Sequence, residues 1–114
     1  MEANLLMKAA ARLQLIKDEW DNLTLEERDE ALVYNRKLWT VLVTSATSAE
    51  SELPQQIKNN VGSLGVFVMK QTMDIIITAD PKKLDTLISI NRSIAEGLRA
   101  VPDPIEQPEA AQAG

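Results

Sequence analysis

The densest group of side chains able to bind a cation is a run of carboxylates between residues 18 and 30. Its members are Asp18, Glu19, Asp21, Glu26, Glu27, Asp29 and Glu30. A calcium loop needs a glycine at its turn and oxygen ligands at alternating positions, and this run lacks such a loop. We therefore interpret it as a solvated surface, part of which complements the positive end of a helix dipole.

Hydroxyl and amine nucleophiles are present, but the groups that usually activate them are not. The sequence has no cysteine and no histidine, which excludes thiolate chemistry and the commonest general base and transition-metal ligand. No pair of carboxylates has positions that indicate acid–base catalysis. Gly62 and Gly65 resemble a phosphate-binding loop only superficially, because no Lys-Ser or Lys-Thr follows them and no strand precedes them. The sequence predicts a protein that is not an enzyme and that holds no cofactor or metal ion.

Two asparagines interrupt rows of apolar residues. Asn35 lies one helical turn before Trp39, and Asn91 interrupts the row Leu84, Leu87, Ile88, Ile94, Ala95 and Leu98. A buried amide is costly unless it finds hydrogen-bond partners. We interpret both asparagines as structural polar residues inside the fold; the alternative is a hydrogen bond to the backbone of a partner.

Apolar residues recur at helical spacing in segments of about residues 2–20, 25–47, 54–78 and 81–100. Thr24 and Glu27 have the spacing of a capping box, while Pro54 and the pair Asp80-Pro81 are typical of helix starts. Short links make consecutive helices antiparallel neighbours. The predicted fold is all-α, an antiparallel four-helix bundle forming one domain over residues 1–100. A disordered acidic tail rich in proline is predicted over residues 101–114.

The segment 54–78 is apolar on two faces. One row contains Ile57, Val61, Leu64, Val68 and Ile75, and the other contains Val66, Met69, Met73 and Ile76. A helix that is apolar on two faces packs between neighbours, so we expect this helix to be central. Gly62 and Gly65 lower helix stability and are tolerable where another backbone packs closely.

With both rows together, this helix has more apolar surface than one neighbouring helix covers. Its methionines are flexible and polarisable, which suits a groove that accepts an amphipathic helix. Tryptophan is enriched at interface hot spots but is more often interior, so core packing is the favoured interpretation of Trp39 and contact with a partner is the alternative. The predicted partner-binding residues are Trp39, Val66, Met69, Met73 and Ile76. The other helices of the bundle, or a homodimer, are alternative covers for the same surface.

Charge and hydropathy exclude several classes of partner. The chain has 114 residues, 45% of them apolar, and a formal charge of −5. An acidic chain lacks the clustered lysine and arginine on which nucleic-acid affinity depends, so no direct binding to nucleic acid is predicted. No uninterrupted apolar run approaches a membrane span, and no signal peptide is present, which predicts a cytoplasmic protein without membrane insertion.

Five short runs occur in an order typical of one protein family. They are Asn35-Arg36-Lys37-Leu38-Trp39, Leu53-Pro54, the run from Val61 to Val68, the run from Ile90 to Ile94, and Glu96-Gly97-Leu98-Arg99. With them the chain resembles the bacterial flagellar biosynthesis regulator FlaF family from about Leu5 to Ala100. One departure is at the start, where Met1 lies almost at the first helix, whereas family members usually carry a short leader.

The resemblance implies a role in flagellin production. It implies a secretion chaperone and positive regulator of flagellin synthesis, which would shelter an amphipathic terminal helix of flagellin in an apolar groove. The family opposes the flagellin-transcript repressor FlbT, so an alternative is a regulatory adaptor that acts on flagellin translation through FlbT without holding flagellin. A structural homodimeric helical bundle is a further alternative.

Overall fold

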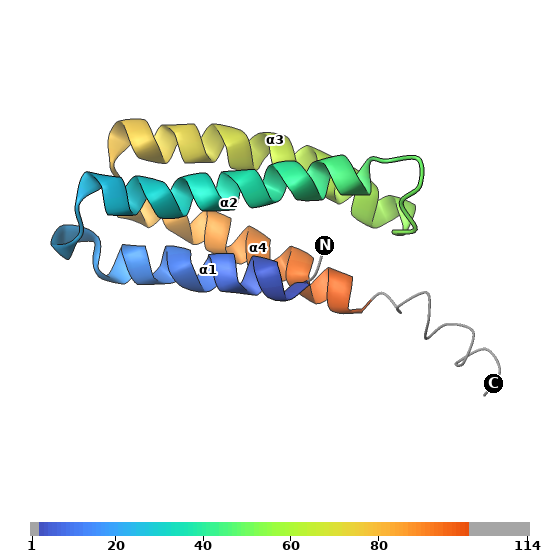
Figure 1. Cartoon of the computed structure of the whole chain (residues 1–114), viewed down its shortest axis with the longest axis horizontal. Helices are drawn as coiled ribbons and strands as arrows, with labels where there is room; N and C mark the ends of the chain where they lie inside the picture. The colour runs from blue at the N-terminus through green and yellow to red at the C-terminus, as the bar shows by residue number, and fades with distance from the viewer. Residues whose placement is uncertain (1–2, 101–114) are drawn as a thin grey trace.

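The computed structural model describes residues 3–100. In this range the chain forms helices α1 (Ala3–Asp18), α2 (Leu25–Ala46), α3 (Gln55–Thr78) and α4 (Leu84–Arg99), with 3-10 turns η1 (Trp20–Asn22) and η2 (Pro81–Lys83). Successive helices run in opposite directions and lie side by side (Figure 1). The predicted all-α antiparallel bundle is confirmed. The predicted tail over residues 101–114 lies outside the described residues.

The predicted capping box begins α2. The backbone N–H of Thr24 donates to Glu27 Oε1 at 2.9 Å, and the backbone N–H of Glu27 donates to Thr24 Oγ1 at 3.2 Å. Hydrogen bonds from the backbone and then the side chain of Thr24 hold the pKa of Glu27 below its ordinary value. Glu27 is therefore the acidic member of the cap that begins α2.

Two predicted helix ends differ from the observed ones. Helix α1 ends at Asp18, and Trp20 lies in η1, where its carbonyl accepts a hydrogen bond from Arg28 Nε at 2.9 Å. In the connection between α3 and α4, the Asp80 carboxylate accepts a hydrogen bond from the Lys82 N–H at 3.0 Å, as predicted for a cap. The turn that follows is η2 rather than α-helix, because the Lys83 N–H bonds to the Asp80 carbonyl three residues back.

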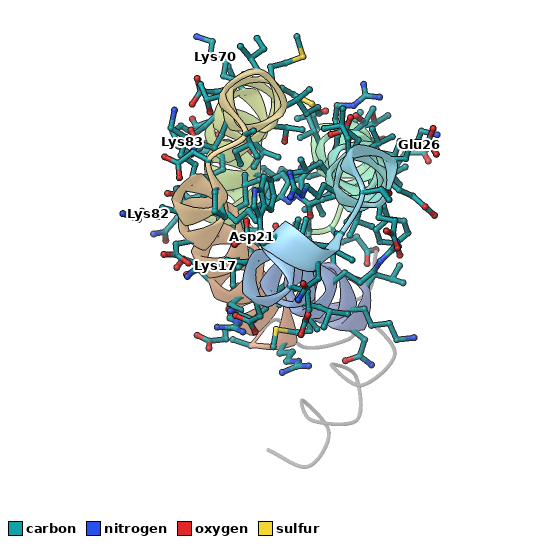
Figure 2. All side chains as sticks on the ribbon, turned by 90° about the vertical axis from the view of Figure 1, so that its left-hand side faces the viewer. Lys17, Asp21, Glu26, Lys70, Lys82 and Lys83 are labelled. Carbon is teal, nitrogen blue, oxygen red and sulfur yellow. The ribbon has the colours of Figure 1, made fainter. Side chains whose placement is uncertain are left out.

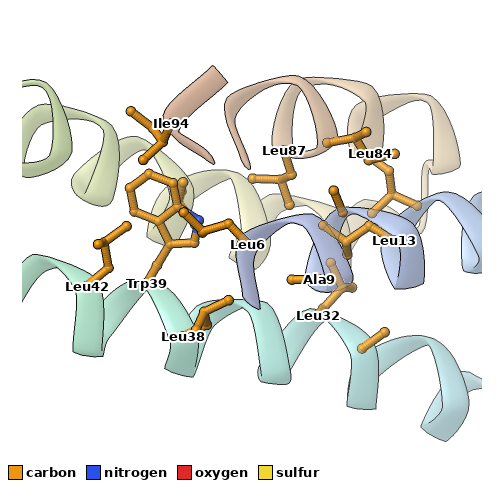
Figure 3. Packing of buried hydrophobic residues seen from close by; sticks show 14 of the residues in the cluster. Leu6, Ala9, Leu13, Leu32, Leu38, Trp39, Leu42, Leu84, Leu87 and Ile94 are labelled. Carbon is orange, nitrogen blue, oxygen red and sulfur yellow. The ribbon is translucent and has the colours of Figure 1, made fainter. Parts of the chain in front are cut away.

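The core lies along the axis of the bundle. Its largest fully buried side chains are Trp39, Leu6, Leu13, Leu32, Leu42, Ile75, Leu84, Leu87, Val61 and Val68. Figure 3 shows the Trp39 ring extending from α2 toward Ile94 of α4, with Leu6 of α1 beside it. Leucines from α1, α2 and α4 thus interdigitate, as helices with few aromatic residues must in order to fill an interior.

Helix α3 is not the central helix that the two apolar rows predicted. Val61, Val68 and Ile75 of the first row are fully buried, whereas Val66 and Met73 of the second row are each 58% exposed. The expectation was wrong because each helix of an antiparallel four-helix bundle has only two direct neighbours. For α3 these are α2 and α4, and they leave its outer side uncovered.

Candidate functional site

A chain of hydrogen bonds joins the two predicted structural asparagines inside the bundle. Trp39 Nε1 donates to Asn91 Oδ1 at 2.7 Å, and Asn91 Nδ2 donates to Asn35 Oδ1 at 2.7 Å. The same Nδ2 lies 3.4 Å from the Leu6 carbonyl of α1. All three side chains are fully buried. This amide chain, made of Trp39, Asn91 and Asn35, connects α2 and α4 and reaches the backbone of α1.

The direction of the amide chain follows from its first member. An indole N–H can only donate, so Asn91 must turn Oδ1 toward Trp39 and Nδ2 toward Asn35. Asn35 must then offer Oδ1 in return. Its own Nδ2 is the single buried side-chain N or O atom without a hydrogen-bond partner within residues 3–100. Both polar side-chain atoms of Asn91 are therefore hydrogen-bonded, whereas only the Oδ1 of Asn35 is.

Trp39 is a core residue, which corrects its inclusion among the predicted partner-binding residues. Its side chain has 0% exposure, and its only ring N–H is already bonded to Asn91. A partner cannot touch Trp39 while the bundle is closed. Core packing, which the sequence favoured for Trp39, is the interpretation that the structure supports.

The two glycines predicted at close helix contacts behave differently. A Cβ on Gly65 would overlap the Cγ2 methyl of Val43, so α2 and α3 approach closely at that point. A Cβ on Gly62 would meet nothing within 4 Å. The prediction holds for Gly65 and is wrong for Gly62, because the latter lies on the outer side of α3, about one turn before Val66.

The other predicted partner-binding residues lie together on the outer side of α3. Val66 and Met73 are exposed, while Met69 and Ile76 are partly buried and pack against the core. Val66, Lys70, Met73 and Ile77 follow one another at spacings of four, three and four residues, which places them on one line of the helix. We call these four residues, with Met69 and Ile76 beside them, the outer α3 stripe. Figure 2 shows its Lys70 on the side of α3 that points away from α1.

Residues of α2 border the stripe on one side. Val43 contacts α3 at Gly65, and Arg36 lies two turns earlier on the same side of α2. Arg36 and Thr40 are exposed, and the Thr40 hydroxyl bonds to the Arg36 carbonyl at 3.0 Å rather than to α3. The edge of α2 next to the stripe therefore presents a guanidinium and a hydroxyl to solvent.

Two members of the stripe were missed from the sequence. Ile77 is 76% exposed, the largest exposed fraction among the large apolar residues described, and Lys70 is also exposed. Ile77 follows Val66 by three helical turns, so spacing alone could have included it. It was hidden by the run Ile75-Ile76-Ile77, in which periodicity does not show which residue points outward.

Helix α3 is also apolar enough to be compared with a membrane span. By length and composition Gln55–Thr78 could cross a membrane, and 28% of its most apolar stretch is buried in the fold. Core helices of water-soluble proteins pass the same test, but they are mostly buried. The low buried share agrees with the exposure of Val66, Met73 and Ile77 on the outer side of α3.

A depression lies between α1 and α2. It has a volume of about 290 Å³ and is lined by Arg12, Leu15, Ile16, Glu19, Leu23, Glu27, Glu30 and Ala31. Two of its charged groups are engaged already, since Arg12 stacks 4.6 Å from the Tyr34 ring centre and Glu27 caps α2. Within residues 3–100, no group of three acidic, cysteine or histidine residues could hold a metal ion. The outer α3 stripe is therefore the stronger candidate site.

The comparisons with known proteins give one match. The family model described as flagellar protein FlaF matches residues 1–98. The comparisons with curated proteins and with solved structures return no match. The matched range includes the amide chain and the whole outer α3 stripe.

Proposed function

Because this chain belongs to the FlaF family of flagellar proteins, we propose that it is a non-enzymatic secretion chaperone for flagellin and a positive regulator of flagellin synthesis. It acts in the cytoplasm by holding an amphipathic terminal helix of flagellin along the outer α3 stripe. When flagellin is exported, that helix is released, so the amount of this protein without bound flagellin depends on how much flagellin remains in the cell.

The observation that carries the proposal is the exposure of the stripe. Val66, Met73 and Ile77 are 58%, 58% and 76% exposed, and they lie on one line of a helix that spans Gln55–Thr78. An amphipathic helix binds such a surface through anchors spaced by three and four residues. Flagellin's terminal regions are amphipathic helices that need shielding before export, so their apolar faces match the stripe.

Two other functions use the same family membership. A regulatory adaptor would act through the repressor FlbT without holding flagellin, and it does not need an exposed stripe. A structural homodimer would cover the stripe with a second copy. The exposed stripe therefore favours the chaperone over the adaptor. Measuring whether the purified protein self-associates distinguishes the chaperone, which is free to bind flagellin, from the homodimer, which covers its own stripe.

The test removes apolar character from the stripe without adding charge. In the double variant Met73→Gln/Ile77→Gln, each side chain loses its apolar end but keeps a helix-compatible shape. We expect binding to full-length flagellin, measured by calorimetry, to weaken at least tenfold, because two buried apolar contacts together contribute about 2 kcal/mol or more. Flagellin lacking its terminal segments should bind neither the parent nor the variant.

The matched control changes apolar residues of equal exposure elsewhere. Leu15 and Val41 are 61% and 57% exposed, and Leu15 lies on α1 while Val41 lies two residues from Val43 and so on another side of α2. Leu15→Gln/Val41→Gln should bind flagellin like the parent. If both double variants bind flagellin unchanged while remaining folded and monomeric, the proposal is wrong, and the adaptor function replaces it.

A further inference from the structure

We propose that Lys70 selects the partner by charge, so that the helix held on the outer α3 stripe must carry a carboxylate within or beside its apolar face. The inference rests on the proposed function and specifies its ligand. The partner is an amphipathic helix with an Asp or Glu facing Lys70, and helices with a basic residue there are rejected.

Lys70 lies inside the stripe rather than at its margin. It follows Val66 by four residues and precedes Met73 and Ile77 by three and seven, so an apolar side chain lies one turn away in each direction. A helix lying along Val66, Met73 and Ile77 must pass over or directly beside the Lys70 ammonium. Docking therefore removes water from a charged group.

No carboxylate of the described chain is paired with Lys70. In residues 3–100 the ion pairs are Lys17–Asp85 and Lys83–Asp74. Asp74 lies four residues after Lys70, so the two side chains are neighbours on the helix surface. It is instead bound by Lys83, with Nζ 2.5 Å from Asp74 Oδ2, and Lys83 belongs to η2 on the far side of α3 from α2. The natural partner of Lys70 is thus held elsewhere.

The surroundings of Lys70 are basic although the whole chain is acidic. Neither the segment from Arg36 to Ala46 nor the segment from Gln55 to Met73 contains an aspartate or glutamate, whereas Arg36, Lys37, Lys58 and Lys70 lie in them. The chain as a whole carries a formal charge of −5. The one carboxylate of α3, Asp74, lies beside the C-terminal end of the stripe and is bound by Lys83. A partner therefore meets net positive charge along the part of the stripe from Val66 to Met73.

This arrangement separates attraction from selection. The apolar members of the stripe attract any amphipathic helix, because the hydrophobic effect is not directional. An ammonium left dry and unpaired is penalised, whereas one that meets a carboxylate is compensated. Like charges brought together at an interface discriminate strongly against the wrong partner. Lys70 and Arg36 therefore supply the specificity that apolar contact alone lacks.

The experiment varies the charge at position 70 and measures binding to flagellin from the same bacterium. Lys70→Glu should weaken binding at least tenfold, because the new carboxylate at position 70 repels the carboxylate of the flagellin helix. Lys70→Met keeps an unbranched side chain without charge and should weaken binding less, while lowering its dependence on salt. The control Lys82→Glu makes the same charge change at an exposed residue of η2 and should leave binding unchanged.

A charge exchange identifies the partner residue. Each Asp and Glu of the flagellin terminal segments is replaced by Lys in turn and tested against Lys70→Glu. At least one replacement should restore binding to Lys70→Glu while weakening binding to the parent. Circular dichroism of every variant checks that the bundle remains folded.

The outcomes distinguish this inference from the function on which it rests. If Met73→Gln/Ile77→Gln weakens flagellin binding but Lys70→Glu behaves like Lys82→Glu, the stripe holds flagellin and Lys70 does not select it. If none of these variants changes flagellin binding, the proposed function itself is wrong. If Lys70→Glu alters only self-association, or only binding to vesicles of phosphatidylcholine and phosphatidylglycerol, then a second copy or a lipid surface occupies the stripe, and the inference is overturned.

Discussion

Two regions of the bundle depart from the usual distribution of side chains, in which apolar groups are buried and polar groups are exposed. They are the junction of α1, α2 and α4 and the outer side of α3, and they depart from it in opposite ways. The junction buries the amides of Asn35 and Asn91, whereas the outer side of α3 exposes Val66, Met73 and Ile77. In the junction, almost every polar atom has found a partner within the chain. On the outer side of α3, no other helix of the described chain covers these three apolar side chains to a similar degree.

The difference separates residues that specify the fold from residues that are available for binding. A buried, hydrogen-bonded amide favours one arrangement of helices, because any shift in register leaves it unpaired. An exposed apolar row adds nothing comparable to the stability of the free bundle, and large rows of this kind usually mark interaction surfaces. The comparison therefore predicts that mutations in the junction affect stability and that mutations on the stripe affect binding.

The largest loss of stability is expected at Trp39. Trp39→Ala removes the largest fully buried side chain and leaves Asn91 Oδ1 without its donor, so the free energy of unfolding should fall by about 3 to 5 kcal/mol. Chemical denaturation monitored by circular dichroism measures this change. Trp39→Phe, which keeps an aromatic ring but no N–H, should be less harmful, and equal losses in both variants would show that the hydrogen bond dominates.

An intermediate loss is expected at Asn91, and a smaller one at Asn35. Asn91→Leu leaves Trp39 Nε1 and Asn35 Oδ1 unpaired, which should lower stability by about 2 to 4 kcal/mol. Asn35→Leu breaks one hydrogen bond and also removes the unpaired Nδ2, so its loss should be about 1 to 2 kcal/mol. Equal losses from the two variants would contradict the direction of the amide chain.

The two glycines of α3 should respond with opposite signs. Gly65→Ala forces Val43 out of its position and should destabilise the bundle by about 1 to 2 kcal/mol. Gly62→Ala meets open space and should stabilise it by about 0.5 to 1 kcal/mol, because alanine is the better helix former. Thermal unfolding of both variants measures the pair, and stabilisation by Gly65→Ala would show that the helices can separate there without loss.

The smallest effect on stability is expected on the stripe itself. Met73→Gln changes a side chain that is 58% exposed and should alter the free energy of unfolding by no more than about 0.5 kcal/mol. The thermal midpoint should then move by no more than about 2 to 4 °C. A loss as large as that of Asn35→Leu would place Met73 in the core and end the distinction between the two regions.

Local signals in the sequence were sufficient to predict most of the fold. The period of the apolar residues located all four helices, and the Thr24–Glu27 capping box placed the start of α2. Asp80 was recognised as a cap, but the winding of η2 was missed, because a 3-10 turn and the first turn of an α-helix use the same residue types. The role of Asn35 and Asn91 as buried amides was also predicted from their interruption of apolar rows.

The pairing of distant residues could not be predicted in the same way. Nothing near Trp39 in the sequence shows that its N–H meets Asn91, which lies 52 residues away. The same applies to α3, whose two apolar rows are equivalent in the sequence, and only the placement of α2 and α4 decides which row is covered. Gly62 and Gly65 likewise differ only through Val43 of α2.

The hydrogen bond from Asn91 to the Leu6 carbonyl joins positions 85 residues apart, and this separation has a consequence for the order of folding during synthesis. The junction cannot close until α4 has left the ribosome, because Asn91 is the member that touches all the others. The pair α2 and α3 is complete earlier, since both helices precede α4 in the chain and contact each other directly. Contacts close in sequence form faster than distant ones, so α2 and α3 are expected to pair before α4 arrives and decides which apolar row of α3 stays exposed.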